Sequence, residues 1–304
     1  MSLPFDHAER MARAHRSLDG LSVGDAFGEH FFRVPNVELL IAERALPFPR
    51  WRYTDDTEMA LAIVDVLDRH GAIDADDLAA CFARRYQANP SRGYGSTAHQ
   101  ILQAIGAGDS WQAAAGRAFD GYGSMGNGAA MRVAPLGAYF ADDLAMVVQQ
   151  ATASAVVTHA HAEGVAGAVA IALAAAKAWR IGMGMDAADG ASLIEAALRA
   201  LPVGETQRGV QHALQLPLEG SPITAARLLG SGLRVTAPDT VPFTLWCAAR
   251  HLVDFEDAMW TTVSGLGDRD TTCAIVGGLV ALSAGTDSVP AEWLRSREPL
   301  AFNQ

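Results

Sequence analysis

Two short acidic segments, one near each end of the chain, carry the residue types best suited to chemistry. They read Thr54-Asp55-Asp56-Thr57 and Gly267-Asp268-Arg269-Asp270-Thr271-Thr272. Each offers two carboxylates and threonine hydroxyls within a few residues, and oxygen ligands of this kind suit hard divalent cations such as Mg²⁺. Four carboxylates would balance the charge of two such ions. The pattern therefore predicts a two-cation site that could receive a diphosphate.

Helix capping is the competing explanation for these aspartates, because both segments precede apolar, helix-like runs. Asp55 followed by Glu58 fits a capping box, and Asp268 and Asp270 stand just before the run that contains Thr272. An aspartate at a helix start contributes about 1 kcal/mol through the free backbone amides and the helix dipole. Because there are two such segments, each with threonine, we favour metal ligands over caps.

A glycine-rich segment in the middle of the chain could bind phosphate. It runs from Gly121 to Arg132 and has four glycines in its first eight residues. Glycine permits positive φ and close backbone approach, and exposed amides in such a loop can hold a phosphate. A surface loop with turn glycines is the alternative. Asn127 and Arg132 place polar groups beside the loop, which favours contact with a ligand.

Two histidines stand near the start of a long alanine-rich run, in the segment Thr158-His159-Ala160-His161-Ala162-Glu163. They are two residues apart and would not share a helix face, whereas a zinc pair on a helix usually has a spacing of three or four. A zinc site is therefore disfavoured. We interpret His159 as a residue that contacts ligand or makes a hydrogen bond at a helix start, with a structural histidine as the alternative.

A segment rich in small residues near the N-terminus also contains carboxylates. Gly20, Gly24 and Gly28 recur every four residues, a spacing that predicts close contact with a second helix. Asp25 and Glu29 would lie one helical turn apart on a shared face. A buried carboxylate there could transfer protons or orient metal ligands, and both roles stay open.

Helices are the elements predicted to position these residues. Alanine, leucine and methionine favour helix, and apolar residues recur mostly at spacings of three and four. Such runs cover residues 59–67, 77–86, 97–107, 154–179, 192–201, 224–229 and 272–283. No alternating β-branched pattern, long linker or internal repeat interrupts them. We therefore predict one compact all-α domain over residues 1–304.

Composition limits the partners and the compartment. A formal net charge of −11 argues against general binding of nucleic acid. The polar start of the chain is unlike a signal peptide, and three scattered cysteines suit a reducing compartment, so we expect a cytoplasmic protein. The most apolar stretch, residues 151–179, contains charged residues and histidines. It is predicted to be a buried helix rather than a membrane span.

With these blocks in order, the chain resembles the ADP-ribosylglycohydrolase family. The matching pieces are Gly24-Asp25-Ala26-Phe27-Gly28, Thr54-Asp55-Asp56-Thr57, Gly126-Asn127-Gly128, Met131-Arg132-Val133-Ala134-Pro135-Leu136-Gly137, Thr158-His159 and Gly267-Asp268-Arg269-Asp270-Thr271. They span nearly the whole chain, and the ordered set is far more specific than any single piece. The resemblance implies an all-α fold and a binuclear centre of two Mg²⁺ or Mn²⁺ ions. It implies metal ligation by Thr54, Asp55, Asp56, Asp268, Asp270 and Thr271, and contacts to ADP-ribose from Gly123, Ser124, Gly126, Asn127, Gly128 and His159.

Two departures from the family pattern affect these expectations. The second acidic segment often reads Asp-Thr-Asp-Thr in the family, whereas Arg269 stands in the middle here. Its side chain should point away from its two neighbours, so Asp268 and Asp270 can still ligate metal. Members of the family also often have a glutamate where this chain has Phe32. Glu29 is the nearest carboxylate that could replace it as the proton donor.

The expected activity is hydrolysis of the glycosidic bond between ADP-ribose and an acceptor, which is a protein side chain or a small conjugate. The transition state is oxocarbenium-like. Asp55, Asp56, Asp268 or Asp270 would take the proton from the attacking water, and Glu29 would protonate the leaving group. A binding or structural protein of the same fold that has lost turnover is the alternative. A helical phosphohydrolase with an adjacent His-Asp pair is disfavoured, because the chain has no such pair.

Overall fold

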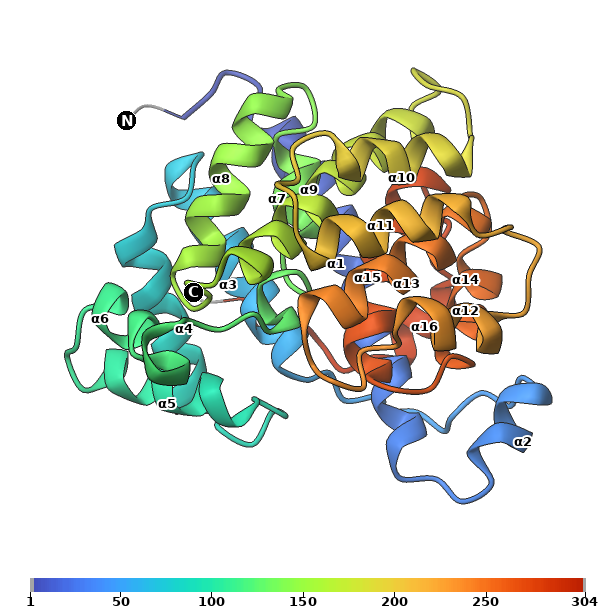
Figure 1. Ribbon diagram of the computed structural model, residues 1–304, viewed down its shortest axis with the longest axis horizontal. Coiled ribbons are helices and arrows are strands. Elements are labelled where there is room, and N and C mark those ends of the chain that lie inside the picture. Colours follow the sequence, from blue (N-terminus) through green and yellow to red (C-terminus); the bar gives the residue numbers. More distant parts are fainter. Residues whose placement is uncertain (1–2, 303–304) are drawn as a thin grey trace.

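The computed structural model describes residues 3–302, and the regular elements among them are helices (Figure 1). Pairing of the β type in this range is limited to two isolated bridges. The prediction of an all-α fold is therefore confirmed. The α-helices are α1 (His7–Glu29), α2 (Val37–Ala42), α3 (Asp55–His70), α4 (Ala75–Ala88), α5 (Ser96–Gly106), α6 (Trp111–Gly116), α7 (Ala134–Tyr139), α8 (Leu144–Val156), α9 (Ala162–Gly182), α10 (Gly190–Leu198), α11 (Glu205–Gln215), α12 (Pro222–Leu229), α13 (Ala237–Arg250), α14 (Phe255–Val263), α15 (Arg269–Ser283) and α16 (Ala291–Ser296).

The helices α1 and α15 pack closely along the middle of the molecule (Figure 1). A Cβ atom at Gly20, Gly24 or Gly28 would lie only 2.1–2.3 Å from a carbonyl oxygen of α15. Side chains at these three positions would therefore force the helices apart, which explains the spacing of four. The contact of Gly28 with Arg269 brings the start of α15, and with it the second acidic segment, to the end of α1.

Most of the predicted helices form, but the run 154–179 is not one helix. The helix α8 ends at Val156 and α9 begins at Ala162. Two contacts favour the break. The guanidinium of Arg132 donates to the Ser154 carbonyl and to Thr158 Oγ1, and Nδ1 of His161 accepts from the Glu163 amide as the N-cap of α9. The expectation of a continuous helix was wrong because side chains satisfy the backbone groups at the break.

The helix α9 is the one helix among residues 3–302 that is long and apolar enough to cross a membrane by length and composition. In this structure 78% of its apolar window is buried inside the protein. It contacts α7, α8, α10, α13 and α15, as a central core helix does. The prediction that this stretch is a buried helix is consistent with that packing.

Candidate active site

The first acidic segment lies at the start of α3 and is held by a buried carboxylate of α1. Asp25 is fully buried and accepts hydrogen bonds from the Thr54 amide at 2.9 Å, the Thr54 hydroxyl at 2.9 Å and the Thr57 amide at 3.1 Å. These bonds fix the turn that leads into Asp55 and Asp56. Of the two roles left open by the sequence, orientation of the acidic segment is the one that this geometry supports.

The carboxylates of this segment are not used as helix caps. Thr54 occupies the N-cap position of α3 and makes no capping bond through its side chain. The predicted capping box between Asp55 and Glu58 was therefore wrong. Glu58 instead accepts a hydrogen bond from Arg85 at 3.0 Å in a buried ion pair. Side-chain caps do occur in this chain, for example at Asp189 of α10, so the difference is specific to the acidic segment.

Asp56 lies in a place that is short of hydrogen-bond donors. Its Oδ2 atom is 3.0 Å from the Thr54 hydroxyl, which also lies 2.9 Å from Asp25. One hydroxyl proton cannot serve both carboxylates. The Oδ1 atom of Asp56 is buried without any hydrogen-bond partner. Such an atom requires a proton, a water or a cation to offset the cost of its burial.

The second acidic segment lies at the start of α15. Asp268 occupies the N-cap position without a capping bond from its side chain. Its Oδ2 atom accepts from Asn127 Nδ2 at 2.7 Å, and its backbone amide donates to the Ser231 carbonyl at 3.0 Å. The side chain of Asp270 accepts from the amide of Thr271, at 2.8 Å. Neither carboxylate of this segment caps a helix.

Arg269 points away from the carboxylates on either side of it, as expected. Its guanidinium donates to the Phe31 carbonyl at 2.6 Å and lies over the Phe32 ring, 4.8 Å from the ring centroid. The substitution of threonine by arginine in this segment therefore adds no positive charge between Asp268 and Asp270. It places that charge against the aromatic residue that replaces the usual glutamate.

The two acidic segments lie close enough to influence one another electrostatically. Burial raises the pKa of Asp55, and repulsion from Asp25 and Asp268 raises it further. Burial and then repulsion from Asp25 and Asp270 raise the pKa of Asp56, and burial followed by repulsion from Asp268 raises that of Asp270. Segments from opposite ends of the chain therefore form one acidic cluster, which gains stability from positive charge placed within it.

The carboxylates of the acidic cluster do not converge on a common point in the way that the ligands of a bound metal do. Among residues 3–302, no three histidine, cysteine, aspartate or glutamate side chains already converge in a metal-binding geometry. The donor set nevertheless consists of carboxylate and hydroxyl oxygens, contributed by Thr54, Asp55, Asp56, Asp268, Asp270 and Thr271, which is the set that Mg²⁺ and Mn²⁺ prefer.

The glycine-rich loop packs against His159, and that contact limits the size of the side chain at two positions of the loop. A Cβ atom would lie 3.1 Å from the His159 ring at Gly126 and 3.0 Å from it at Gly128. Positive φ is found instead at Gly121 and Gly123, where φ is 92° and 77°. The amide of Gly126 already donates to Ser124 Oγ at 3.1 Å. The loop residues and His159 thus lie together, as predicted, but close packing accounts for part of the glycine pattern.

His159 is buried and neutral. Burial, followed by repulsion from Arg132, lowers the pKa of its imidazole to about 3. Its Nδ1 atom is 2.7 Å from the Thr158 hydroxyl. Arg132 itself is fully buried, and its guanidinium lies 4.4 Å from the centroid of the Phe82 ring, so it is a structural residue beside the site. A neutral imidazole at the loop can donate or accept one hydrogen bond without adding charge.

Two contacts of the acidic cluster were not predicted from the sequence. Asn127 was expected to contact ligand, but its side-chain amide donates to Asp268 and, at 3.1 Å, to Thr240 Oγ1. The amide of Asp55 donates to the Arg92 carbonyl at 2.7 Å, and Gly93 beside it has a φ of 91°. A Cβ atom at Gly93 would lie 3.3 Å from Asp55 Oδ1. Gly93, one of two glycines in the loop 89–95, was the available signal for this approach.

Glu29 is the last residue of α1 and is partly buried. It follows Asp25 by one helical turn, a spacing that places both residues on the same face of α1. Burial raises the pKa of its carboxyl group, while the nearby charges of Arg33 and Arg52 oppose that rise. Phe32, by contrast, is 40% exposed and carries no ionisable group.

Comparison with known proteins identifies the family. The model of the ADP-ribosylglycohydrolase family matches residues 6–301. The chain belongs to the ADP-ribosylglycohydrolase family. The human ADP-ribosylhydrolase ARH3 is 28% identical over 335 aligned residues, covering 96% of this chain and 90% of that protein. The ADP-ribosylarginine hydrolase Tri1 of Pseudomonas putida (strain GB-1) is 24% identical, covering 97% of this chain and 76% of that protein.

A solved structure supports the same assignment. It is the structure of an ADP-ribosylglycohydrolase-related protein complex, with a TM-score of 0.69 and 27% sequence identity. The match covers 95% of this chain and 93% of the other. Family membership and the all-α fold therefore agree with the resemblance seen in the acidic and glycine-rich segments.

Proposed function

We propose that this member of the ADP-ribosylglycohydrolase family is a hydrolase that depends on divalent cations. It cleaves the glycosidic bond between ADP-ribose and an acceptor and releases free ADP-ribose. The observation that carries the proposal is the meeting of the two acidic segments in one cluster, with carboxylates that cap no helix. The names of the relatives, ADP-ribosylhydrolase and ADP-ribosylarginine hydrolase, support the class of bond that is broken.

The residues of the acidic cluster fit two Mg²⁺ or Mn²⁺ ions. The buried Oδ1 atom of Asp56 has no partner, so an acceptor is available where a cation would bind. After burial itself, repulsion from neighbouring carboxylates raises the pKa values of Asp56 and Asp270, so a cation placed among them would be stabilised. We propose that Thr54, Asp55, Asp56, Asp268, Asp270 and Thr271 hold these ions.

The chain supplies positioning and proton transfer for the reaction. Bound divalent cations would orient the ribose hydroxyls and make a water acidic enough to attack near neutral pH. Asp25 holds Thr54 in place and Asn127 holds Asp268, so the cluster is fixed before substrate arrives. Asp55, Asp56 or Asp270 accepts the proton of the attacking water, and the anomeric carbon passes through an oxocarbenium-like state.

The glycine-rich loop and His159 are proposed to hold ADP-ribose. The backbone at Gly123, Ser124, Gly126, Asn127 and Gly128 lies against the neutral His159 ring. Small residues there let a diphosphate approach the main chain. Asn127 also connects this loop to Asp268, so the part of the site that holds nucleotide and the acidic cluster share a residue.

Glu29 is the proposed proton donor to the leaving group, and Glu29→Gln is expected to slow turnover by about 10²–10⁴-fold. The raised pKa keeps Glu29 protonated to a higher pH than an ordinary glutamate. Activity that requires this protonated form is therefore full at low pH and lost as pH rises through the folded-state pKa. Glu29→Gln should remove that decline from the pH–rate profile of ADP-ribose release.

Glu43→Gln is the matched control for this variant, because Glu43 is an exposed glutamate of the same region. It should leave both the rate and the pH profile unchanged. A loss of less than about threefold in Glu29→Gln would mean that the leaving group needs no acid of this kind. Glu29 would then have a packing role only.

The second candidate is a protein that binds ADP-ribose without cleaving it. Phe32, which occupies the usual glutamate position and lies under Arg269, is the observation that favours this alternative. Release of ADP-ribose from a panel of defined conjugates separates the two, since a binder would retain the conjugate intact.

A further inference from the structure

Residues 296–298, at the end of α16 and just after it, lie against the stretch of chain that leads into the first acidic segment. The amide of Trp51 donates to the Ser296 carbonyl at 2.7 Å, and the amide of Glu298 donates to the Trp51 carbonyl at 2.9 Å. These bonds accompany the parallel bridge between Trp51 and Arg297. Two stretches that are far apart in the sequence are therefore joined just before Thr54.

An ion pair between Glu298 and Arg92 encloses the backbone of Tyr53. Oε1 of Glu298 accepts a hydrogen bond from the Tyr53 amide at 3.0 Å, and Nη1 of Arg92 donates to the Tyr53 carbonyl at 2.8 Å. The same Oε1 and Nη1 atoms also bond to each other. The Arg92 guanidinium lies over the Tyr53 ring, 4.2 Å from its centroid. One ion pair thus fixes both backbone polar groups of the residue that precedes Thr54.

Arg92 holds the first acidic segment at a second point, through its own backbone. Its carbonyl accepts from the Asp55 amide at 2.7 Å. The first amides of a helix have no partner within the helix, so this bond satisfies a group that α3 leaves open. Arg92 therefore contacts the chain on both sides of Thr54, at Tyr53 through the guanidinium and at Asp55 through the carbonyl. Glu298 is a carboxylate that orients this arginine.

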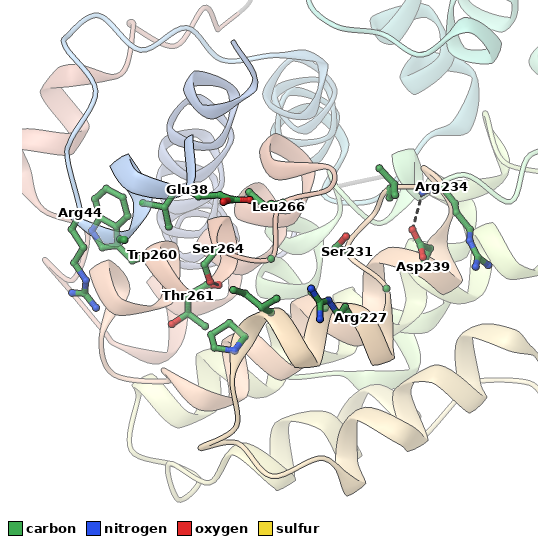
Figure 2. A pocket seen from close by; sticks show the side chains of 18 residues that line it. Glu38, Arg44, Arg227, Ser231, Arg234, Asp239, Trp260, Thr261, Ser264 and Leu266 are labelled. Atoms are coloured by element: carbon green, nitrogen blue, oxygen red, sulfur yellow. Dashed lines mark hydrogen bonds between the residues drawn. The ribbon is translucent and has the colours of Figure 1, made fainter. Parts of the chain in front are cut away.

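The second acidic segment is held by a different part of the backbone. The amide of Asp268 donates to the Ser231 carbonyl at 3.0 Å. Figure 2 shows Ser231 at the wall of a cavity of about 780 Å³, together with Asp239, whose carboxylate accepts from the Arg234 amide at 2.8 Å. A change at Glu298 is therefore expected to disturb the first acidic segment and to spare the second.

We propose that Glu298 is a positioning residue for the cation site, because through Arg92 it holds Thr54 and Asp55 in the arrangement that binds divalent cations. The inference rests on the proposed function. The guanidinium of an arginine is planar and its donors have fixed directions, so a carboxylate partner determines where they point. Groups that orient metal ligands typically change the affinity for the metal by about 10–100-fold when they are replaced.

Glu298→Gln is the variant that tests this role. It keeps an oxygen for the Tyr53 amide and removes the charge that faces Arg92. Arg92 retains Glu58, whose Oε1 atom lies 3.5 Å from its Nε, so the variant should fold. Calorimetric titration of the chelated protein with Mn²⁺, at a temperature where it is folded, should show binding weaker than in the parent by about tenfold. Release of ADP-ribose should need correspondingly more Mn²⁺, while KM for the conjugate should not change.

Asp142→Asn is the matched control. Asp142 is the partner of Arg13, which is buried like Arg92 but contacts none of the acidic segments. Both variants remove the charge that faces a buried arginine, so both should lower the thermal unfolding midpoint. Only Glu298→Gln should weaken the binding of Mn²⁺ to the folded protein. Glu292→Gln, at an exposed glutamate of α16, should change neither property.

A double-mutant cycle with Arg92→Gln tests the route through the arginine. If Glu298 acts through Arg92, Glu298→Gln should weaken Mn²⁺ binding little further once Arg92 has been replaced. Losses that add fully in the double variant would overturn this route, because Glu298 would then act on the Tyr53 amide alone.

Mn²⁺ binding as tight in Glu298→Gln as in the parent would overturn the role of Glu298. Equal weakening in Asp142→Asn would also overturn it, because the affinity would then follow general stability. A parent protein that bound no Mn²⁺ would overturn the proposed cation dependence and the role of Glu298 together. The binding measurement thus separates a failure of this inference alone from a failure of the proposed function.

Discussion

Replacing Asp270 by alanine is expected to abolish release of ADP-ribose while the protein stays folded. The side chain of Asp270 caps no helix and accepts a hydrogen bond from the adjacent Thr271 amide. The variant removes one member of a repulsive cluster, so the free energy of unfolding without metal should not fall. Loss of a group that organises the charge developing in the transition state lowers the rate by about 10²–10³-fold or more.

Asp189→Ala is the matched control, since Asp189 is an aspartate that does cap its helix, by accepting from the amides of Ala191 and Ser192. It should cost about 1 kcal/mol of stability and leave activity unchanged. Circular dichroism and ADP-ribose release, measured on both variants, distinguish a ligand from a cap. A folded Asp270→Ala protein with nearly normal turnover would refute the role of Asp270 in catalysis.

Removal of divalent cations is expected to lower the thermal unfolding midpoint. The buried carboxylates repel one another, and cations that bind only the folded state relieve that repulsion. A hundredfold excess over the dissociation constant adds about 2.7 kcal/mol of stability, which is a rise of about 5 °C for a chain of this size. The measurement is unfolding after chelation, with and without millimolar Mg²⁺ or Mn²⁺.

Asp56→Ala serves as the control for this shift, because it deletes the carboxylate whose Oδ1 atom lacks a partner. Its midpoint should respond weakly or not at all to the same ions. A parent protein whose midpoint is the same in chelator and in millimolar metal would contradict the proposed two-cation site. Equal shifts in the parent and in Asp56→Ala would place the cations elsewhere.

Local pattern was sufficient to predict the helical fold and the packing of α1. The spacing of Gly20, Gly24 and Gly28 reflects one physical requirement, contact with the backbone of α15. The break between α8 and α9 could not be predicted in this way. It depends on Arg132, which is distant in sequence and binds the Ser154 carbonyl and the Thr158 hydroxyl. Helix propensities depend on the residue types along the chain and take no account of a contact between distant residues.

The site was partly predictable for a similar reason. The residue types of the acidic segments indicate oxygen ligands wherever the segments lie. Which residues orient them depends on tertiary structure. The bond between Asn127 and Asp268, and that between Asp55 and the Arg92 carbonyl, join segments that no local pattern relates. The prediction of a capping box was wrong although the spacing of Asp55 and Glu58 fits one. Glu58 instead makes a stronger, charge-assisted hydrogen bond with Arg85.

The measurement that tests the central claim most directly is release of free ADP-ribose from defined conjugates by chelated protein, before and after divalent metal is restored. The panel should include arginine-linked and serine-linked ADP-ribose on peptides and one small conjugate. The proposed function predicts no release in chelator and restored release with Mg²⁺ or Mn²⁺ for at least one linkage. Equal release in chelator would contradict cation dependence, and binding of every conjugate without release at any metal concentration would contradict hydrolysis.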